Sequence, residues 1–304
     1  MFTQSLDTIR RLRRPLWVLL TVFILHAGCR EESAEEILPP APVAPKEIPL
    51  ERYKKMFRSS SVAIPTGSVT SAFTLAPNGS DIVIGGSDAS VWVLPIATGT
   101  PHVLISHSEP IQRAVYTQDG QTLVTAGDDN RWIAWDIVEE RPIHEIRAHS
   151  RDIRALAISP DGALLATGSE DSNVHLWRLQ SGERIHAFNA HTKSVQDVVF
   201  SSDGQTLISG GNDSQVRRWD IKTRKNIAGA ISVGHTIKRM AWTADGRYLI
   251  VAGGQGHTSW LDASKWTVSA RKRHKSHATI LSLAVSNEGL IATGNSRGLL
   301  TFWS

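Results

Sequence analysis

Short apolar runs alternate with polar turns along most of this chain. Residues 153–158 alternate in polarity and lead into the turn Ser159-Pro160-Asp161-Gly162, and apolar runs follow over 163–168 and 174–177. Short β-rich runs bounded by Asp, Gly, Asn and Ser turns are typical of antiparallel strands. An Asp-Gly pair between two such runs predicts a hairpin, because its turn needs positive φ. With a fourth run over 184–188, the pattern predicts four strands in one unit.

The same unit recurs along the chain at a fixed period. Asp-Gly pairs stand 42 residues apart at Asp119-Gly120, Asp161-Gly162, Asp203-Gly204 and Asp245-Gly246. Weaker copies, Asn78-Gly79 and Glu288-Gly289, extend the series at both ends. A period of this length indicates a repeat architecture in which every copy is one four-stranded blade of a propeller.

These residues resemble the repeats of the WD-repeat (tryptophan-aspartate) β-propeller family. The third copy carries the family's elements in order: His149, Ser159-Pro160-Asp161-Gly162, Ala166-Thr167-Gly168-Ser169, Asp171 and Trp177. Trp135-Asp136 and Trp219-Asp220 supply the dipeptide that names the family. The resemblance covers about residues 60–304. It implies an all-β propeller, for which we predict six blades. A truncated or incomplete seven-bladed ring is the alternative.

The spacing divides residues 59–304 into six repeats. They lie at about 66–98, 105–139, 147–181, 189–223, 233–264 and 275–304. In this family each repeat spans the outer strand of one blade and the inner three strands of the next. Residues 60–64 occupy the outer-strand position ahead of the first blade. We therefore expect them to pair with the last blade and to remove the open edges that such sheets avoid.

Sets of one His, one hydroxyl residue, one Asp and one Trp repeat within the chain. A single set could be drawn as a catalytic triad, but three equivalent copies fit a structural role better. In WD-repeat relatives such a set forms a buried relay, in which each polar group finds a partner. The predicted relays are His107, Thr125, Asp129 and Trp135; His149, Thr167, Asp171 and Trp177; and His191, Ser209, Asp213 and Trp219.

Three copies depart from the relay pattern. The first has Leu94 at the Trp position, the fifth has the Gly-rich stretch 253–256 where a hydroxyl and an Asp are expected, and the sixth has Arg297 at the Asp position. We therefore expect complete relays in blades 2 to 4 only. His257, which comes directly after the Gly-rich stretch, is expected to be a surface loop residue.

The resemblance also implies a face for binding partners. Relatives use the rim of the central channel, where each blade offers the residue before the relay Asp and residues at the start of the inner strand. The matching residues are Asp128, Glu170, Asn212, Asp152, Arg154, Gln112, Gln196 and Lys238. This rim is mixed in charge and lacks the aromatic anchors of strong binding hot spots. It predicts a polar partner or modest affinity, unless these are ordinary turn residues.

The N-terminus predicts export. Arg10-Arg11-Leu12-Arg13-Arg14 precedes an apolar run over 16–25, and Ala27-Gly28 and the sole cysteine, Cys29, follow. This is the order of a secretory signal, and the run is short for a membrane span. Ala-Gly-Cys resembles a bacterial lipoprotein signal, although His26 stands where Leu is usual. We predict a signal peptide over 1–28 and lipidation of Cys29. A plain cleaved signal, which gives a periplasmic or secreted protein, and a single uncleaved anchor are the alternatives.

The segment between the leader and the propeller has a composition that does not favour folding. Residues 29–58 are rich in Glu, Pro and Ala, which predicts a disordered tether. Residues 1–28 hold four Arg and one Asp, so about +1 of the formal net charge of +4 belongs to the rest. This charge does not indicate a nucleic-acid partner. No cysteine remains for disulfides, and no metal-ligand spacing appears beyond the relays, so we expect no cofactor and no metal.

These observations favour a monomeric, non-enzymatic scaffold for protein–protein interaction. We expect it to be tethered to a membrane of the bacterial cell envelope through a lipid anchor alone, with an unidentified protein partner at the rim. One alternative is an envelope assembly factor that helps to insert outer-membrane proteins. The other is a propeller enzyme, which would place metal ligands or acidic residues in the channel.

Overall fold

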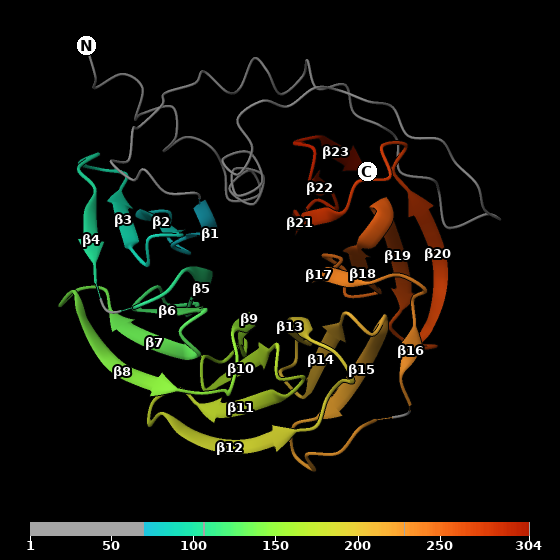
Figure 1. The fold of residues 1–304 in the computed structure, drawn as a ribbon, viewed down its shortest axis with the longest axis horizontal. Helices are drawn as coiled ribbons and strands as arrows, with labels where there is room; N and C mark the ends of the chain where they lie inside the picture. Colours follow the sequence, from blue (N-terminus) through green and yellow to red (C-terminus); the bar gives the residue numbers. More distant parts are fainter. Residues whose placement is uncertain (1–69, 106, 228, 304) are drawn as a thin grey trace.

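The computed structural model describes residues 70–303 apart from 106 and 228. These residues form six antiparallel sheets arranged around a central axis like the blades of a propeller (Figure 1). The predicted all-β, six-bladed propeller is therefore confirmed. The predicted signal peptide, Cys29, the tether 29–58 and the closing strand 60–64 lie outside the described residues.

Each blade is a meander in which consecutive strands are neighbours. Blade 1 contains β1 (Thr70–Leu75), β2 (Asp81–Gly86), β3 (Val91–Pro95) and β4 (His102–Leu104). Blade 2 contains β5 (Ile111–Tyr116), β6 (Thr122–Gly127), β7 (Arg131–Asp136) and β8 (Arg141–Arg147). Blade 3 contains β9 (Ile153–Ile158), β10 (Leu164–Ser169), β11 (Val174–Arg178) and β12 (Glu183–Phe188). Blade 4 contains β13 (Val195–Phe200), β14 (Thr206–Gly211), β15 (Gln215–Asp220) and β16 (Ile231–Ser232). Blade 5 contains β17 (Ile237–Trp242), β18 (Tyr248–Gly253), the short 3-10 helix η2 (Gly254–Gly256), β19 (His257–Asp262) and β20 (Thr267–Arg273). Blade 6 contains β21 (Ile280–Val285), β22 (Ile291–Asn295) and β23 (Leu300–Trp303).

The first strand of each blade lies at the axis, and long strands such as β8, β12 and β20 lie at the outside (Figure 1). The inner strands pack side by side in the order β1, β5, β9, β13, β17 and β21. Among the described residues, no comparable packing joins β21 to β1, and the ring is open there in Figure 1. Within residues 70–303, each of the two end blades therefore packs against one neighbouring blade.

The repeated Asp-Gly pairs form the turns between the first two strands. In blade 3, Asp161 Oδ1 accepts hydrogen bonds from the Ser159 hydroxyl at 2.5 Å and from the Ala163 N–H at 3.0 Å. Gly162 adopts a φ of 75°, a conformation that costs glycine little. Blades 2, 4 and 5 repeat these contacts through Thr117 and Asp119, Ser201 and Asp203, and Thr243 and Asp245. The local chemistry of the turn thus explains the period found in the sequence.

The core consists of separate apolar clusters between neighbouring blades. Between blades 2 and 3, buried Trp132 packs edge-on against Trp177 with ring centroids 5.6 Å apart. On blade 6, Ile291 and Trp303 pack with Ile250 of blade 5. Both faces of a blade strand are therefore buried, which accounts for apolar runs longer than strict alternation would give.

All six inner strands carry a register shift at the same place, near the strand's first residue. Each shift leaves one residue of the inner strand without a partner in the next strand, as in a β-bulge, which re-aims the side chain. The six residues are Ser71, Gln112, Arg154, Gln196, Lys238 and Leu281. Four of them are residues that the sequence assigns to the rim.

Candidate functional site

Three sets of polar side chains form continuous chains of hydrogen bonds inside blades 2, 3 and 4. In blade 3, the Trp177 indole N–H donates to Thr167 Oγ1 at 3.0 Å, and Thr167 Oγ1 lies 2.7 Å from His149 Nε2. His149 Nδ1 lies 3.0 Å from Asp171 Oδ2. The other sets make the same contacts at 2.8–3.0 Å through His107, Thr125, Asp129 and Trp135, and through His191, Ser209, Asp213 and Trp219. The fold thus brings each predicted relay set together.

The carboxylate sets the direction of the hydrogen bonds in the relay. Burial by itself would raise the pKa of Asp171, but the hydrogen bond from His149 and those from two backbone N–H groups hold that pKa well below its ordinary value. An ionised carboxylate only accepts, so His149 Nδ1 donates to it. A neutral imidazole then accepts through Nε2 from the Thr167 hydroxyl, which is free to accept the Trp177 N–H. Every polar atom of the relay therefore has a suitable partner.

Five of the eight predicted rim residues form an acidic sector over blades 2 and 3. Arg154, a bulge residue, donates from Nε to Glu170 Oε1 at 2.9 Å and from Nη2 to Asp152 Oδ2 at 2.8 Å. Its Nη1 lies 3.3 Å from Asp128 Oδ1, and Gln112 donates to Asp128 Oδ2 at 3.1 Å. Burial raises the pKa of Asp128, and Arg154 opposes this. Three carboxylates face one guanidinium, so the sector is net negative.

The other three rim residues form a basic sector over blades 4 and 5. Lys238, another bulge residue, donates from Nζ to Gln196 Oε1 at 2.9 Å and to Asn212 Oδ1 at 3.4 Å. Burial lowers the pKa of Lys238, and the neighbouring Arg239 adds to this effect. Both hydrogen-bond acceptors of Lys238 are neutral amides, and the carboxylate of Glu170 in the acidic sector also acts on its charge.

The guanidinium of Arg113 joins two blades that are not neighbours in sequence. Arg113 of blade 2 donates from Nη2 to the Gln196 carbonyl of blade 4 at 3.2 Å, although blade 3 separates these blades in sequence. Arg239 of blade 5 and the carboxylate of Asp197 lie close to this group. Burial and the charge of Arg239 lower the pKa of Arg113 to about 9, and burial raises that of Asp197. Charged side chains of blades 2, 4 and 5 therefore lie close together beside the rim.

Comparison with known families agrees with this geometry. The family model described as "WD domain, G-beta repeat" matches residues 99–136, 140–178 and 182–220. Each matched segment contains the outer strand of one blade and the first three strands of the next. The described residues form a six-bladed β-propeller with WD40 repeats. No curated protein matches the chain significantly.

Blade 6 of this WD40 propeller contains a set of polar side chains around His274 that the fixed spacing of the relay residues did not reveal. His274 Nε2 lies 3.1 Å from Thr293 Oγ1, and its Nδ1 lies 3.2 Å from Thr301 Oγ1. The Trp303 indole packs edge-on against this imidazole, and its N–H has no hydrogen-bond partner among the described residues. The exposed Arg297 takes no part. The His–hydroxyl separation is 19 residues here against 18 in the relays, and a search allowing one inserted residue would have found it.

Blade 5 departs further from the relay pattern. His235 Nε2 lies 3.0 Å from Ser259 Oγ, and the ring stacks on His257 with centroids 5.4 Å apart. Leu261, not Trp260, occupies the register position of the relay Trp. The expectation that His257 is a surface loop residue was wrong, because it lies on β19 and contacts a buried imidazole. His235 and Ser259 are separated by 24 residues, which no fixed-period search would recover.

The described part of the chain also lacks two kinds of feature. Among residues 70–303, apart from 106 and 228, no group of three or more His, Cys, Asp or Glu side chains is placed to hold a metal ion. Nor does any helix in that part have the length and apolar character needed to cross a membrane.

Removal of a relay carboxylate should destabilise the propeller. Asp171→Ala leaves the buried His149 Nδ1 and two backbone N–H groups without their acceptor, so we expect a loss of about 1–3 kcal/mol in the free energy of unfolding. Arg297→Ala, at an exposed position of the sixth repeat, should cost much less. Urea unfolding of the two variants checks this, and equal losses would contradict the assigned role of the relay.

Acid should weaken the fold partly through His274. Burial lowers the pKa of His274 from 6.5 to about 4, so the unfolded chain binds this proton first as the pH falls. The stability contributed by the neutral ring is complete above pH 6.5 and is lost as the pH falls toward 4. Between pH 7 and pH 5, wild type should lose about 2 kcal/mol more than His274→Gln. Urea unfolding at the two pH values measures this, and equal losses would show that His274 does not contribute.

Proposed function

We propose that this protein is a non-enzymatic scaffold for protein–protein interaction, exported and tethered to a bacterial envelope membrane through a lipidated Cys29. In this proposal the segment 29–58 is a flexible tether, and the propeller binds a protein partner at the rim. WD40 propellers are typically interaction scaffolds, which supports the general class. The order of charged, apolar and small residues before Cys29 supports the location.

The observation that carries the rim proposal is the division of its charge over a repeated backbone feature. The same bulge presents Arg154 within a net negative sector on blades 2 and 3 and presents Lys238 among neutral amides on blades 4 and 5. A partner that fits this face carries a cation opposite the first sector and a carboxylate opposite the second. Such complementarity favours orientation and rapid encounter more than high affinity.

The bond from Arg113 of blade 2 to blade 4 supports the non-enzymatic interpretation. Propeller enzymes place reactive groups in an accessible channel, whereas here Arg113 of blade 2 is engaged with a backbone carbonyl of blade 4. Asp197 accepts a hydrogen bond from the Met240 N–H at 2.6 Å, so its carboxylate is already engaged. The rim therefore presents polar side chains that are already paired with one another, which suits a protein partner better than a substrate.

Neutralising one charge in each sector should weaken partner binding. Glu170→Gln with Lys238→Gln preserves side-chain shape but removes the opposed charges, and we expect at least a fivefold loss of partner co-purified from the solubilised envelope of the native host. The matched control, Glu139→Gln with Lys222→Gln, removes the same charge types from exposed turns away from the rim. Partners recovered in equal amount with wild type and the rim variant would refute the assigned surface.

Lipidation of Cys29 can be tested separately from partner binding. The full-length wild type, expressed in a bacterium supplied with radiolabelled palmitate, should incorporate label and fractionate with membranes. Cys29→Ser should incorporate none, because the thiol that carries the lipid is gone, and Ser33→Ala should behave as wild type. An unlabelled wild type would remove the lipoprotein proposal and leave a plain cleaved signal or an uncleaved anchor.

A further inference from the structure

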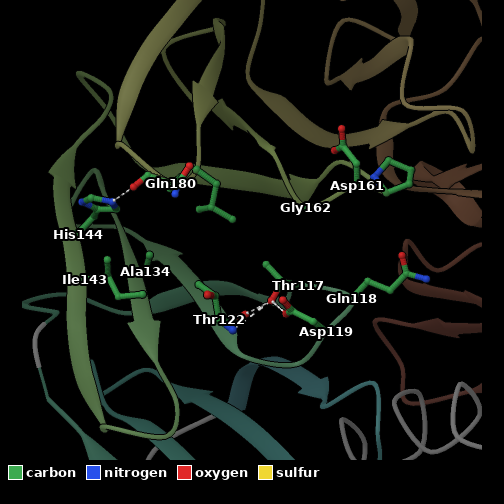
Figure 2. Close-up of a pocket in the computed structure, with 12 residues that line it drawn as sticks. Thr117, Gln118, Asp119, Thr122, Ala134, Ile143, His144, Asp161, Gly162 and Gln180 are labelled. Atoms are coloured by element: carbon green, nitrogen blue, oxygen red, sulfur yellow. Dashed lines mark hydrogen bonds between the residues drawn. The ribbon is translucent and has the colours of Figure 1, made fainter.

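A pocket of about 710 Å³ opens between blades 2 and 3, away from the rim (Figure 2). The inner strand β5 begins at the rim with Ile111 and ends at Tyr116, so the turn after it lies at the other end of the blade. That turn forms one wall, and the turn Pro160–Gly162 of blade 3 forms the facing wall in Figure 2. The base comes from the outer parts of both blades and includes Ala134, Ile143, His144, Leu179 and Gln180.

The small side chain of Ala134 is one reason for the pocket. The equivalent register positions in the other blades carry Val93, Leu176, Arg218, Trp260 and Phe302. Each of these larger side chains fills space beside its strand; Leu176, for example, belongs to the cluster between blades 3 and 4. Ala134 belongs to the corresponding cluster between blades 2 and 3 and leaves the end of that cluster unfilled.

The residue before the Asp-Gly turn is the second reason. Between blades 1 and 2, Pro77 Cδ lies 3.5 Å from the place that a β-carbon on Gly120 would take, and Pro160 lies equally close to Gly204 between blades 3 and 4. Gln118 stands at this position in blade 2, and the same place on Gly162 has no atom within 4 Å. The prolines thus narrow the two flanking junctions, and Gln118 leaves this one open.

Two ionised carboxylates stand on opposite walls of the pocket. The Thr117 hydroxyl and the Gln121 N–H lower the pKa of Asp119, and the Ser159 hydroxyl and Ala163 N–H do the same for Asp161. Each carboxylate receives these bonds at Oδ1. Both side chains are exposed, and Figure 2 shows them on the two sides of the opening. The walls are therefore negative at neutral pH.

Apolar surface lies beneath this charge. Ile143 lines the pocket with 42% of its surface exposed, an unusual state for an isoleucine in a chain whose large apolar side chains are mostly buried. His144 Nε2 lies 3.0 Å from the Gln180 carbonyl and closes the base between the two blades (Figure 2). The volume falls in the range of natural ligand pockets, and an open cleft with charged walls and an apolar base suits an amphipathic side-chain pair.

We propose that this pocket binds an extended segment of a protein partner in which a Lys or Arg stands beside an aliphatic residue. The cationic head lies between Asp119 and Asp161, and the aliphatic side chain fills the space over Ala134 and Ile143. The pocket is separate from the rim, so the propeller holds two partner surfaces at opposite ends of the ring. This assignment does not depend on the rim being a binding site.

Selection from a random peptide library on the full-length protein tests the proposal without a known partner. Recovered peptides, synthesised with a fluorescein label, are titrated by fluorescence polarisation. We expect them to carry Lys or Arg next to an aliphatic residue and to bind more weakly as NaCl rises. Ala134→Leu, which copies blade 3, should lower their affinity at least tenfold. Asp119→Asn with Asp161→Asn should lower it by a similar factor.

Matched controls distinguish an effect on the pocket from a general effect of changing an Asp in these turns. Asp203→Asn with Asp245→Asn makes the same change in turns with the same hydroxyl contacts, and affinity should stay within twofold of wild type. The rim variant Glu170→Gln with Lys238→Gln should also bind normally. Gln118→Pro copies blades 1 and 3 and should weaken binding if Ala134→Leu proves unstable.

Several results would overturn the proposal. The first is that no recovered peptide depends on these residues for binding, and the second is that the recovered peptides are acidic. The third is that wild type and the variants with a filled pocket, Ala134→Leu and Gln118→Pro, bind the peptides equally. Tighter binding of a peptide copying residues 8–16 would assign the pocket to the chain's own N-terminus. Self-association lost in Ala134→Leu would assign it to a second copy.

Discussion

The buried chain of hydrogen bonds from Trp through a hydroxyl and His to Asp is the interaction on which the geometry of the rim depends. In blade 3, His149 precedes the inner strand, Thr167 lies on the second strand, Trp177 on the third, and Asp171 in the turn between them. The rim residue Glu170 directly precedes that Asp. Because a buried donor left without an acceptor costs about 1–3 kcal/mol, the turn cannot shift without breaking the relay, and the rim side chain is held in place from inside the blade.

The repeats share one backbone arrangement, and the side chains that differ between copies determine the chemistry of each surface. The inner-strand bulge recurs in six blades, yet it carries Arg154 among carboxylates in one and Lys238 among amides in another. The backbone geometry is common to both, so the charge pattern of the rim follows from single side chains. The same holds at the opposite end of the ring, where Ala134 and Gln118 distinguish one junction between blades from its neighbours.

The fold, the relays and the placement of the rim residues could be predicted because each rests on residues at a constant separation within one repeat. His274 was missed because one additional residue separates it from its hydroxyl partner. The bond from Arg113 to Gln196 joins residues 83 apart across the ring, and its formation depends on the diameter that the packed blades create. The pocket was out of reach for a similar reason: the small size of Ala134 matters only once a neighbouring blade is placed beside it.

The junction between blades 2 and 3 shows how such a pocket can persist in a packed propeller. Trp132 stands near the start of β7, at the rim end of that strand, and packs against the relay residue Trp177 with both side chains buried. Fully burying one large apolar side chain contributes about 1.5–3 kcal/mol, so this pair holds the two blades together close to a relay. Ala134, two residues further along β7, is then free to be small. The aromatic pair secures the part of the junction that positions the rim, and the other end of the junction can remain open for a ligand.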